Sequence, residues 1–235
     1  MMVVYGKNVV EELLYSNVKI TSAFVMKGFS DDNLLDKLNR VCSNIKILER
    51  SELDKMEKGN HQGIIVKIPD YEYCDIDDCI TDNPFLLILD HIEDPHNLGA
   101  IIRTSEAAGV DAIIIPKNRS VEVNSTVMKT SAGALNNMKI CLVNNISNTM
   151  NYLKKKGIWI IGTDMDGSDY SSIDYSMPLA IVIGNEGKGL GTLVKQNCDF
   201  IASIPMKGKI NSLNASVASA LMIYKVVDGR TNGKI

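Results

Sequence analysis

Three polar segments between residues 89 and 220 hold the side chains best suited to binding or reacting with a ligand. The first runs from Leu89 to Thr104 and contains Asp94, Asn97 and Arg103. Asp94 or Asn97 can cap a helix that begins near Pro95, and capping alone would explain both residues. Capping does not explain Arg103, which lies six residues after Asn97 and therefore less than two helical turns away. An isolated arginine on a helix is usually solvated, so this segment by itself only suggests a site.

The second segment is a glycine-rich loop, residues 184–191, in which glycines let the backbone approach a ligand closely. It differs from a P-loop, because Gly187-Lys188 is followed by glycine instead of serine or threonine. It also differs from a dinucleotide-binding turn, because Thr192 stands where the last glycine or alanine is required. Glu186 would repel a phosphate group. The loop therefore favours a ligand other than a phosphate.

The third segment, residues 204–220, places a hydroxyl and an amide at the start of a predicted helix. Ser212 is a good helix N-cap, which is its ordinary explanation. Asn214 in the first turn is a poor helix former, so its amide needs another reason. Together the two side chains can serve one ligand. The alanines and serines between 215 and 220 make the helix thin, so that another backbone can approach it.

These segments need a framework that brings them together, and apolar runs predict one. Strands are predicted at 85–89, 112–115, 158–161 and 179–183. Helices are predicted at 98–109, 122–131, 146–156, 190–197 and 213–227. Continuous apolar strands that alternate with helices indicate a parallel sheet covered on both faces. Ligands bind beyond the carboxyl ends of such strands, and the first two polar segments each come directly after a predicted strand.

The first seventy residues form a separate predicted unit. Apolar spacing gives helices at 6–16, 31–43 and 51–58, and strands at 22–26, 45–48 and 63–68. The next stretch, 71–84, has five acidic residues and no basic one, lacks a helical or alternating period, and ends in the turn signal Asn83-Pro84. We therefore predict a small α/β domain over 1–70, an acidic linker over 71–84 and a larger α/β domain over 85–235.

Composition excludes several classes of protein. The 235 residues are 45% hydrophobic with a net charge of −3, which is typical of a globular chain and not of a disordered one. This charge excludes nucleic-acid binding through overall positive charge, although local patches can still hold phosphate. No apolar run reaches a membrane-spanning length, and residues 1–7 do not resemble a signal peptide. Five scattered cysteines and three histidines predict neither a disulfide framework nor a zinc site, so we expect a cytoplasmic protein with reduced thiols.

The three polar segments also share an order and a spacing. Their motif residues are Asp94-Pro95-x-Asn97-x-Gly99-Ala100-Ile101-x-Arg103-Thr104, then Gly184-Asn185-Glu186-x-x-Gly189, then Ile204-Pro205-Met206 with Ser212-Leu213-Asn214-x-Ser216-x-Ala218. In this arrangement they resemble the three signature motifs of the SpoU (TrmH) branch of the SPOUT RNA methyltransferases. Residues 5–10 and 60–65 resemble the opening and closing signatures of that family's substrate-binding domain. The two-domain layout is most similar to the 23S rRNA guanosine 2′-O-methyltransferases.

The resemblance implies a fold, a cofactor and partners. It implies an α/β SPOUT domain with a parallel sheet and a trefoil knot at its carboxyl end, preceded by a small α/β substrate-binding domain. It implies that a homodimer transfers a methyl group from S-adenosylmethionine to the ribose 2′-hydroxyl of a guanosine in 23S rRNA or its ribosomal precursor. No metal is expected, since the sulfonium methyl group is already activated, and no membrane is expected, since no apolar run reaches a membrane-spanning length.

The resemblance also assigns roles to residues of the three motifs. Arg103 would contact the hydroxyl and the adjacent phosphate, either as general base or purely as a phosphate-positioning group. Glu186 would orient Arg103. Asn97, Ser212 and Asn214 would hold the hydroxyl, the phosphate or the amino-acid end of the cofactor. The residues expected to line the cofactor pocket are Thr163, Gly184, Asn185, Gly189, Ile204, Met206, Ser212 and Leu213.

Three other functions compete with this one. A tRNA ribose 2′-O-methyltransferase would use the same motifs, so that alternative stays open. A catalytically inactive RNA-binding relative is disfavoured, because the residues with implied catalytic roles are all present. A nucleotide-dependent oxidoreductase is disfavoured by the missing dinucleotide-binding fingerprint.

Overall fold

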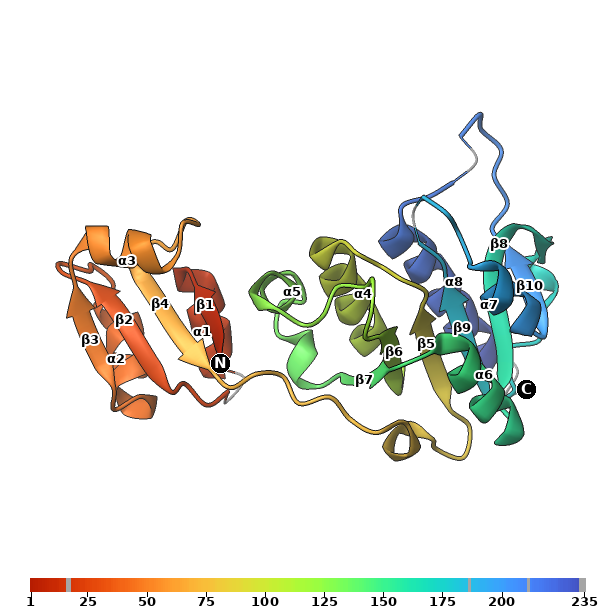
Figure 1. Cartoon of the computed structure of the whole chain (residues 1–235), viewed down its shortest axis with the longest axis horizontal. Coiled ribbons are helices and arrows are strands. Elements are labelled where there is room, and N and C mark those ends of the chain that lie inside the picture. The colour runs from red at the N-terminus through yellow and green to blue at the C-terminus, as the bar shows by residue number, and fades with distance from the viewer. Residues whose placement is uncertain (16–17, 186, 211, 233–235) are drawn as a thin grey trace.

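The computed structural model describes residues 1–15, 18–185, 187–210 and 212–232, and within them the strands form two separate sheets. One sheet lies toward the amino terminus, the other occupies most of the remaining chain, and an extended segment connects them (Figure 1). No helix in the described ranges is long and apolar enough to cross a membrane.

The amino-terminal sheet has the strand order β1-β4-β2-β3. Its elements are β1 (Met2–Tyr5), α1 (Lys7–Tyr15), β2 (Ser22–Met26), α2 (Asp32–Val41), β3 (Ile45–Leu48), α3 (Arg50–Met56) and β4 (Ile64–Ile68). Strands β1 and β2 pair antiparallel with β4, and β3 pairs parallel with β2. The predicted helices and strands are confirmed to within two residues at each end. Strand β1 was not predicted, because it is a short edge strand in which only Val4 is buried.

The larger sheet has the strand order β10-β8-β9-β5-β6-β7, and each neighbouring pair runs parallel. Its elements are β5 (Phe85–Leu89), α4 (Pro95–Ala107), β6 (Ala112–Pro116), α5 (Ser125–Thr130), β7 (Lys139–Val143), α6 (Ile146–Lys155), β8 (Trp159–Asp169), β9 (Leu179–Ile183), α7 (Thr192–Asn197), β10 (Phe200–Ser203) and α8 (Ala215–Asn232). The predicted parallel α/β architecture is confirmed. The edge strands β7 and β10 were not predicted, because they carry polar residues such as Lys139 and Ser203 in place of a continuous apolar run.

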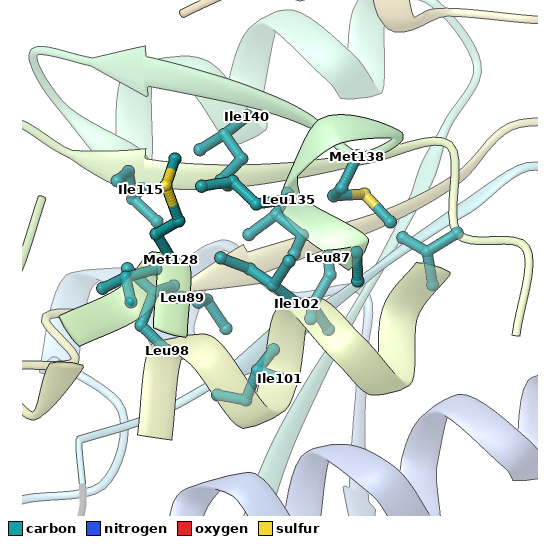
Figure 2. Close-up of a cluster of buried hydrophobic side chains, with 14 of the residues drawn as sticks. Leu87, Leu89, Leu98, Ile101, Ile102, Ile115, Met128, Leu135, Met138 and Ile140 are labelled. Atoms are coloured by element: carbon teal, nitrogen blue, oxygen red, sulfur yellow. The ribbon is translucent and has the colours of Figure 1, made fainter. Parts of the chain in front are cut away.

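Helices cover both faces of this sheet. Successive side chains of a strand point to opposite faces, so each buried strand contributes to two hydrophobic clusters. On one face Leu87 of β5 lies in a cluster with Ile102 of α4 and Met128 of α5 (Figure 2). On the other face Leu86 lies in a cluster with Leu153 of α6. The layering leaves the carboxyl ends of the strands free to form a site.

Residues 71–84, which we predicted to be an acidic linker, follow the β7 edge of the larger sheet. The Tyr71 hydroxyl donates to the carbonyl of Met138 at 2.7 Å, and the Cys74 N–H donates to the backbone of β7 at 3.0 Å. The segment also contains a short 3-10 helix, η1 (Ile76–Cys79). We had not predicted this helix, because the sequence of the segment has no helical period. The first half of the segment is therefore held against the sheet by hydrogen bonds.

Candidate functional site

A cavity of about 450 Å³ lies at the carboxyl edge of the larger sheet, beside β8, β9 and β10. Five stretches of the chain contribute residues to its wall: 163–166, 183–185, 187–189, 202–206 and 212–218. Only some residues of the last two stretches face the cavity. All eight residues predicted for the cofactor pocket are in that wall: Thr163, Gly184, Asn185, Gly189, Ile204, Met206, Ser212 and Leu213. The fold therefore gathers them from three separate stretches of the chain.

The glycine-rich loop folds back on itself where it forms the cavity wall. The Gly189 N–H donates to the Asn185 carbonyl at 2.9 Å, and the Asn185 N–H donates to the Gly189 carbonyl at 3.1 Å. A Cβ atom at Gly184 would lie 2.4 Å from the carbonyl carbon of Gly189, closer than real contacts allow. Gly189 itself has a φ of +64°, a left-handed conformation that favours glycine. Glycine is thus required at 184 and favoured at 189 by the loop itself.

Asp90 and His91, at the end of β5, fix this loop to the first motif. Asp90 is 2% exposed, and its side chain accepts a hydrogen bond from the Gly191 N–H at 2.7 Å. Its other oxygen lies 2.6 Å from Nδ1 of His91. The Asn185 side chain donates to the His91 carbonyl at 2.8 Å. We had assigned no role to Asp90 from the sequence, although its place directly after a buried strand indicates a position near a binding site.

The first and third motifs meet through two asparagines. Nδ2 of Asn214 donates to Oδ1 of Asn97 at 3.0 Å, and Asn97 is 8% exposed in the first turn of α4. Oδ1 of Asn214 accepts from the Ser216 N–H at 2.9 Å, just before α8 begins. Asn214 therefore caps this helix, which corrects the expectation that Ser212 is the N-cap. Ser212 is exposed and lines the cavity.

The structure also decides which residue caps α4. Oδ1 of Asp94 accepts a hydrogen bond from the His96 N–H at 2.9 Å, and Pro95 is the first helical residue. Asp94 is therefore the N-cap of α4, and Asn97 is not. This agrees with the use of Asn97 as a contact to the third motif.

Arg103 lies in the exposed part of α4, outside the cavity wall as far as the chain is described. No hydrogen bond or ion pair holds its guanidinium within the described ranges. Glu186, which was predicted to orient it, lies outside the described residues. The structure thus joins Asn97 to Asn214, puts Ser212 in the cavity wall, and leaves Arg103 as an exposed cation on the same helix as Asn97.

Charged side chains that the sequence had not singled out also line the cavity, namely Asp164, Asp166, Lys188 and Lys195. Nζ of Lys195 lies 3.0 Å from Oδ1 of Asp164 and 3.4 Å from Oδ2 of Asp166. The hydrogen bond with Asp164 raises the pKa of Lys195. Both aspartates follow the predicted strand 158–161. The rule that ligands bind beyond the carboxyl ends of parallel strands could therefore have identified them from the sequence.

Thr163 uses its hydroxyl within the sheet. Its Oγ1 donates to the carbonyl of Val182 at 2.8 Å, which links β8 to β9 beside the cavity. The residue therefore positions the wall, and its hydroxyl is already satisfied.

Comparison with known proteins agrees with this geometry. The family model described as "SpoU rRNA Methylase family" matches residues 84–224, and the one described as "RNA 2'-O ribose methyltransferase substrate binding" matches residues 3–74. The chain belongs to the SpoU (TrmH) family of RNA methyltransferases. It is 42% identical over 234 residues to YacO of Bacillus subtilis (strain 168), which is named for the TrmH family of tRNA/rRNA methyltransferases, with 95% of this chain and 94% of that one covered.

Solved structures of the family share the fold. The SpoU methyltransferase AviRb from Streptomyces viridochromogenes, in complex with the cofactor AdoMet, superposes with a TM-score of 0.84 at 22% identity, covering 99% of this chain and 91% of that one. An AdoMet-bound rRNA methyltransferase from Sinorhizobium meliloti gives a TM-score of 0.79 at 24% identity, covering 96% and 86%. At this level of identity the likeness establishes the fold of both sheets together.

Proposed function

We propose that the chain transfers the methyl group of S-adenosylmethionine to a ribose 2′-hydroxyl of RNA, and that the target is a guanosine of 23S rRNA or its ribosomal precursor. The observation that carries the proposal is that two of the three motifs meet at one cavity and that the first motif is hydrogen-bonded to the third. The second and third motifs form its wall, and the Asn97–Asn214 hydrogen bond joins the third motif to the first. Such an arrangement can hold a cofactor on one side and an RNA nucleoside on the other.

The cavity fits the cofactor in size and in chemistry. Its volume of about 450 Å³ lies in the range of roughly 300–1,000 Å³ that is typical of small-molecule sites. Ile183, Ile204 and Leu213 supply apolar walls for an adenine ring, and the backbone of the glycine-rich loop supplies polar groups at its edge. The Asp164 carboxylate can accept hydrogen bonds from ribose hydroxyls. When bound, S-adenosylmethionine supplies a methyl group that the sulfonium already activates.

Arg103 is the group that we assign to the RNA. A guanidinium offers planar N–H donors that match a phosphate, and this one is exposed with no acceptor in the described part of the chain. Of the two roles that the family resemblance leaves open, we assign phosphate positioning, because the exposed guanidinium can reach an RNA backbone. The exposed Ser212 hydroxyl in the cavity wall, together with the Asn97–Asn214 pair, would hold the ribose hydroxyl or the end of the cofactor.

We also propose that two copies of the chain associate through α8. Val217, Leu221 and Tyr224 are 47%, 40% and 52% exposed. Their spacing of four and three residues puts them on one side of the helix, while Met222 and Val226 are fully buried against the sheet. A second copy that covers this apolar side would form the homodimer. Sedimentation of a Leu221→Asp variant as a monomer, with wild type as a dimer, is the expected result.

The trefoil knot and the cytoplasmic location belong to the same proposal. Strand β10 pairs with β8 at one edge of the sheet, whereas α8 packs beside β9 and α4. The chain therefore returns across β8 between these two elements, and membership of the SpoU family is what supports a knot there. A cytoplasmic location would give the enzyme access to ribosomal precursors.

Methyl transfer from labelled S-adenosylmethionine to total RNA tests the proposal. We expect label in large-subunit rRNA, and an Arg103→Ala variant that is slower by at least about 100-fold, as for the loss of a positioning contact. Lys155→Ala is the matched control, because Lys155 is an exposed cation on α6. Label in tRNA would replace the proposed target, and absence of cofactor binding in calorimetry would refute the activity.

A further inference from the structure

Three of the five cysteines lie together at the β7 edge of the larger sheet, far from the cavity wall. Cys74 and Cys79 belong to the connecting segment, and Cys141 belongs to β7. The Sγ atoms of Cys74 and Cys141 are 3.1 Å apart, and Sγ of Cys79 lies 3.3 Å from each of them. Cys79 and Cys141 are each 1% exposed, while Cys74 is half-buried. The sulfur atoms thus form a nearly equilateral triangle with one corner toward solvent.

The backbone fixes this triangle. Cys74 pairs with Cys141 as an isolated parallel bridge, and its N–H donates to the Ile140 carbonyl at 3.0 Å. The 3-10 helix η1 then turns the chain back, so that Cys79 points to the same place. Its Sγ also lies 3.5 Å from the Asp75 carbonyl. The three thiols are therefore placed by main-chain structure on two segments that are 67 residues apart.

We propose that Cys74, Cys79 and Cys141 bind one thiophilic d¹⁰ metal ion, Zn²⁺ or Cu⁺, through three thiolates. Zinc–thiolate bonds are about 2.3 Å long, so tetrahedral coordination needs sulfur atoms about 3.8 Å apart, and each sulfur would move outward by about 0.3 Å. Soft thiolates select this class of ion. A disulfide would use only two of the three sulfur atoms, at about 2.05 Å, and would leave the third buried beside it.

The charge balance of the step is simple. Three S–H bonds are lost as three metal–sulfur bonds form, the protons go to solvent, and no electron is transferred. The Lys139 ammonium lies beside η1, where a positive charge favours the thiolate form of the cysteines. The Lys139 side chain also donates to the Asp78 carbonyl at 2.7 Å, which holds its charge beside η1.

The site has three protein ligands and an open position. In the described residues, the group of metal-ligating side chains within reach of one another contains these cysteines and no histidine or carboxylate. Cu⁺ can be held by three thiolates alone, whereas Zn²⁺ would take water as a fourth ligand on the Cys74 side. A bound ion would link the connecting segment to β7, and so fix the attachment of the amino-terminal sheet to the methyltransferase sheet.

Metal titrations of the full chain under a non-thiol reductant test the proposal. Zn²⁺ and Cu⁺ are added separately in competition with a chromophoric chelator, and Co²⁺ is used to detect thiolate-to-metal charge-transfer absorption. We expect one ion per chain for wild type and for Cys198→Ser, a matched control at a half-buried cysteine outside the triangle. Cys74→Ser should weaken binding by at least about 100-fold, since even outer contacts of a metal site contribute 10- to 100-fold.

The outcomes separate the alternatives. Binding of Zn²⁺ only, or of Cu⁺ only, identifies the ion and supports the site. The absence of stoichiometric binding by reduced wild type would overturn the proposal, as would equal binding by Cys74→Ser. A disulfide that forms on exposure to air, with no metal bound by the reduced chain, would assign the cluster to redox chemistry instead. Thiolate-to-metal charge-transfer absorption of wild type, with Co²⁺ or with Cu⁺, decides the question even where a variant folds poorly.

Discussion

Replacing Gly184 by alanine tests whether the glycine-rich loop must close on itself to form the cavity. The added Cβ would lie 2.4 Å from the carbonyl carbon of Gly189 and 2.6 Å from both the Gly189 oxygen and the Leu190 nitrogen. All three atoms are backbone atoms, so no side-chain rotation relieves the contact. An ordinary contact needs about 3.4 Å or more, and the loop must therefore shift by about 1 Å, as in cases of overpacking that cost about 1–3 kcal/mol.

The same shift breaks the two hydrogen bonds between Asn185 and Gly189, each worth about 1 kcal/mol. We expect cofactor affinity to fall by about 100-fold, because an error of 1 Å in a binding site has effects of that size. We also expect the melting temperature to fall by about 2–4 °C for each kcal/mol lost. Calorimetric titration with S-adenosylmethionine and thermal melts measure the two effects.

Gly208→Ala is the control for this experiment. Gly208 lies in the segment before α8, outside the described cavity wall, and a Cβ there would meet no atom within 4 Å. This variant should bind and melt like wild type. If Gly184→Ala binds the cofactor as tightly as Gly208→Ala and melts at the same temperature, the loop does not need the closed conformation and the account of the cavity is wrong.

Three further predictions concern the polar contacts. A double-mutant cycle of Asn97→Ala and Asn214→Ala, measured by urea unfolding, should give a coupling of about 1 kcal/mol, and additivity would show that their hydrogen bond contributes nothing. Asp90→Ala should lower the free energy of unfolding by about 1–3 kcal/mol, because the Gly191 N–H loses its acceptor. An unchanged urea midpoint would contradict this. Burial raises the pKa of Tyr71 and of Tyr175 to about 12, whereas a tyrosine in the unfolded chain ionises near pH 10. The free energy of unfolding should therefore fall as the pH rises from about 10 to 12. Urea midpoints at pH 8 and pH 11 measure the difference.

The parallel sheet was predictable because its central strands are apolar on both faces. Strand β5 is buried at all five positions, and such a run is readable without knowledge of its neighbours. The edge strand β7 is not readable in this way, since Lys139 at its start is exposed and only its middle residues are buried. Local pattern therefore identified the centre of the sheet and missed its edges.

The eight expected pocket residues were predicted through the likeness to a family, and the contacts between motifs were not predictable at all. The hydrogen bond between Asn97 and Asn214 joins residues 117 positions apart, and that between Asp90 and Gly191 joins residues 101 apart. The cysteine triangle depends in the same way on Cys141 meeting a segment 67 residues earlier. Spacing along a chain carries no signal for contacts of this kind, because they arise only when the sheet has formed.

The polar residues of the site divide into two groups by the hydrogen bonds that they already make. In the first group the hydrogen bonds join one motif to another, as they do for Asp90, Asn185 and the pair Asn97 and Asn214. Substitutions in this group should change stability and cofactor affinity together, since each removes a contact that shapes the cavity. Arg103 is exposed and makes no such contact in the described part of the chain. Its substitution should therefore slow methyl transfer while the melting temperature and the cofactor affinity stay at wild-type values, and a loss of stability in Arg103→Ala would place it in the first group.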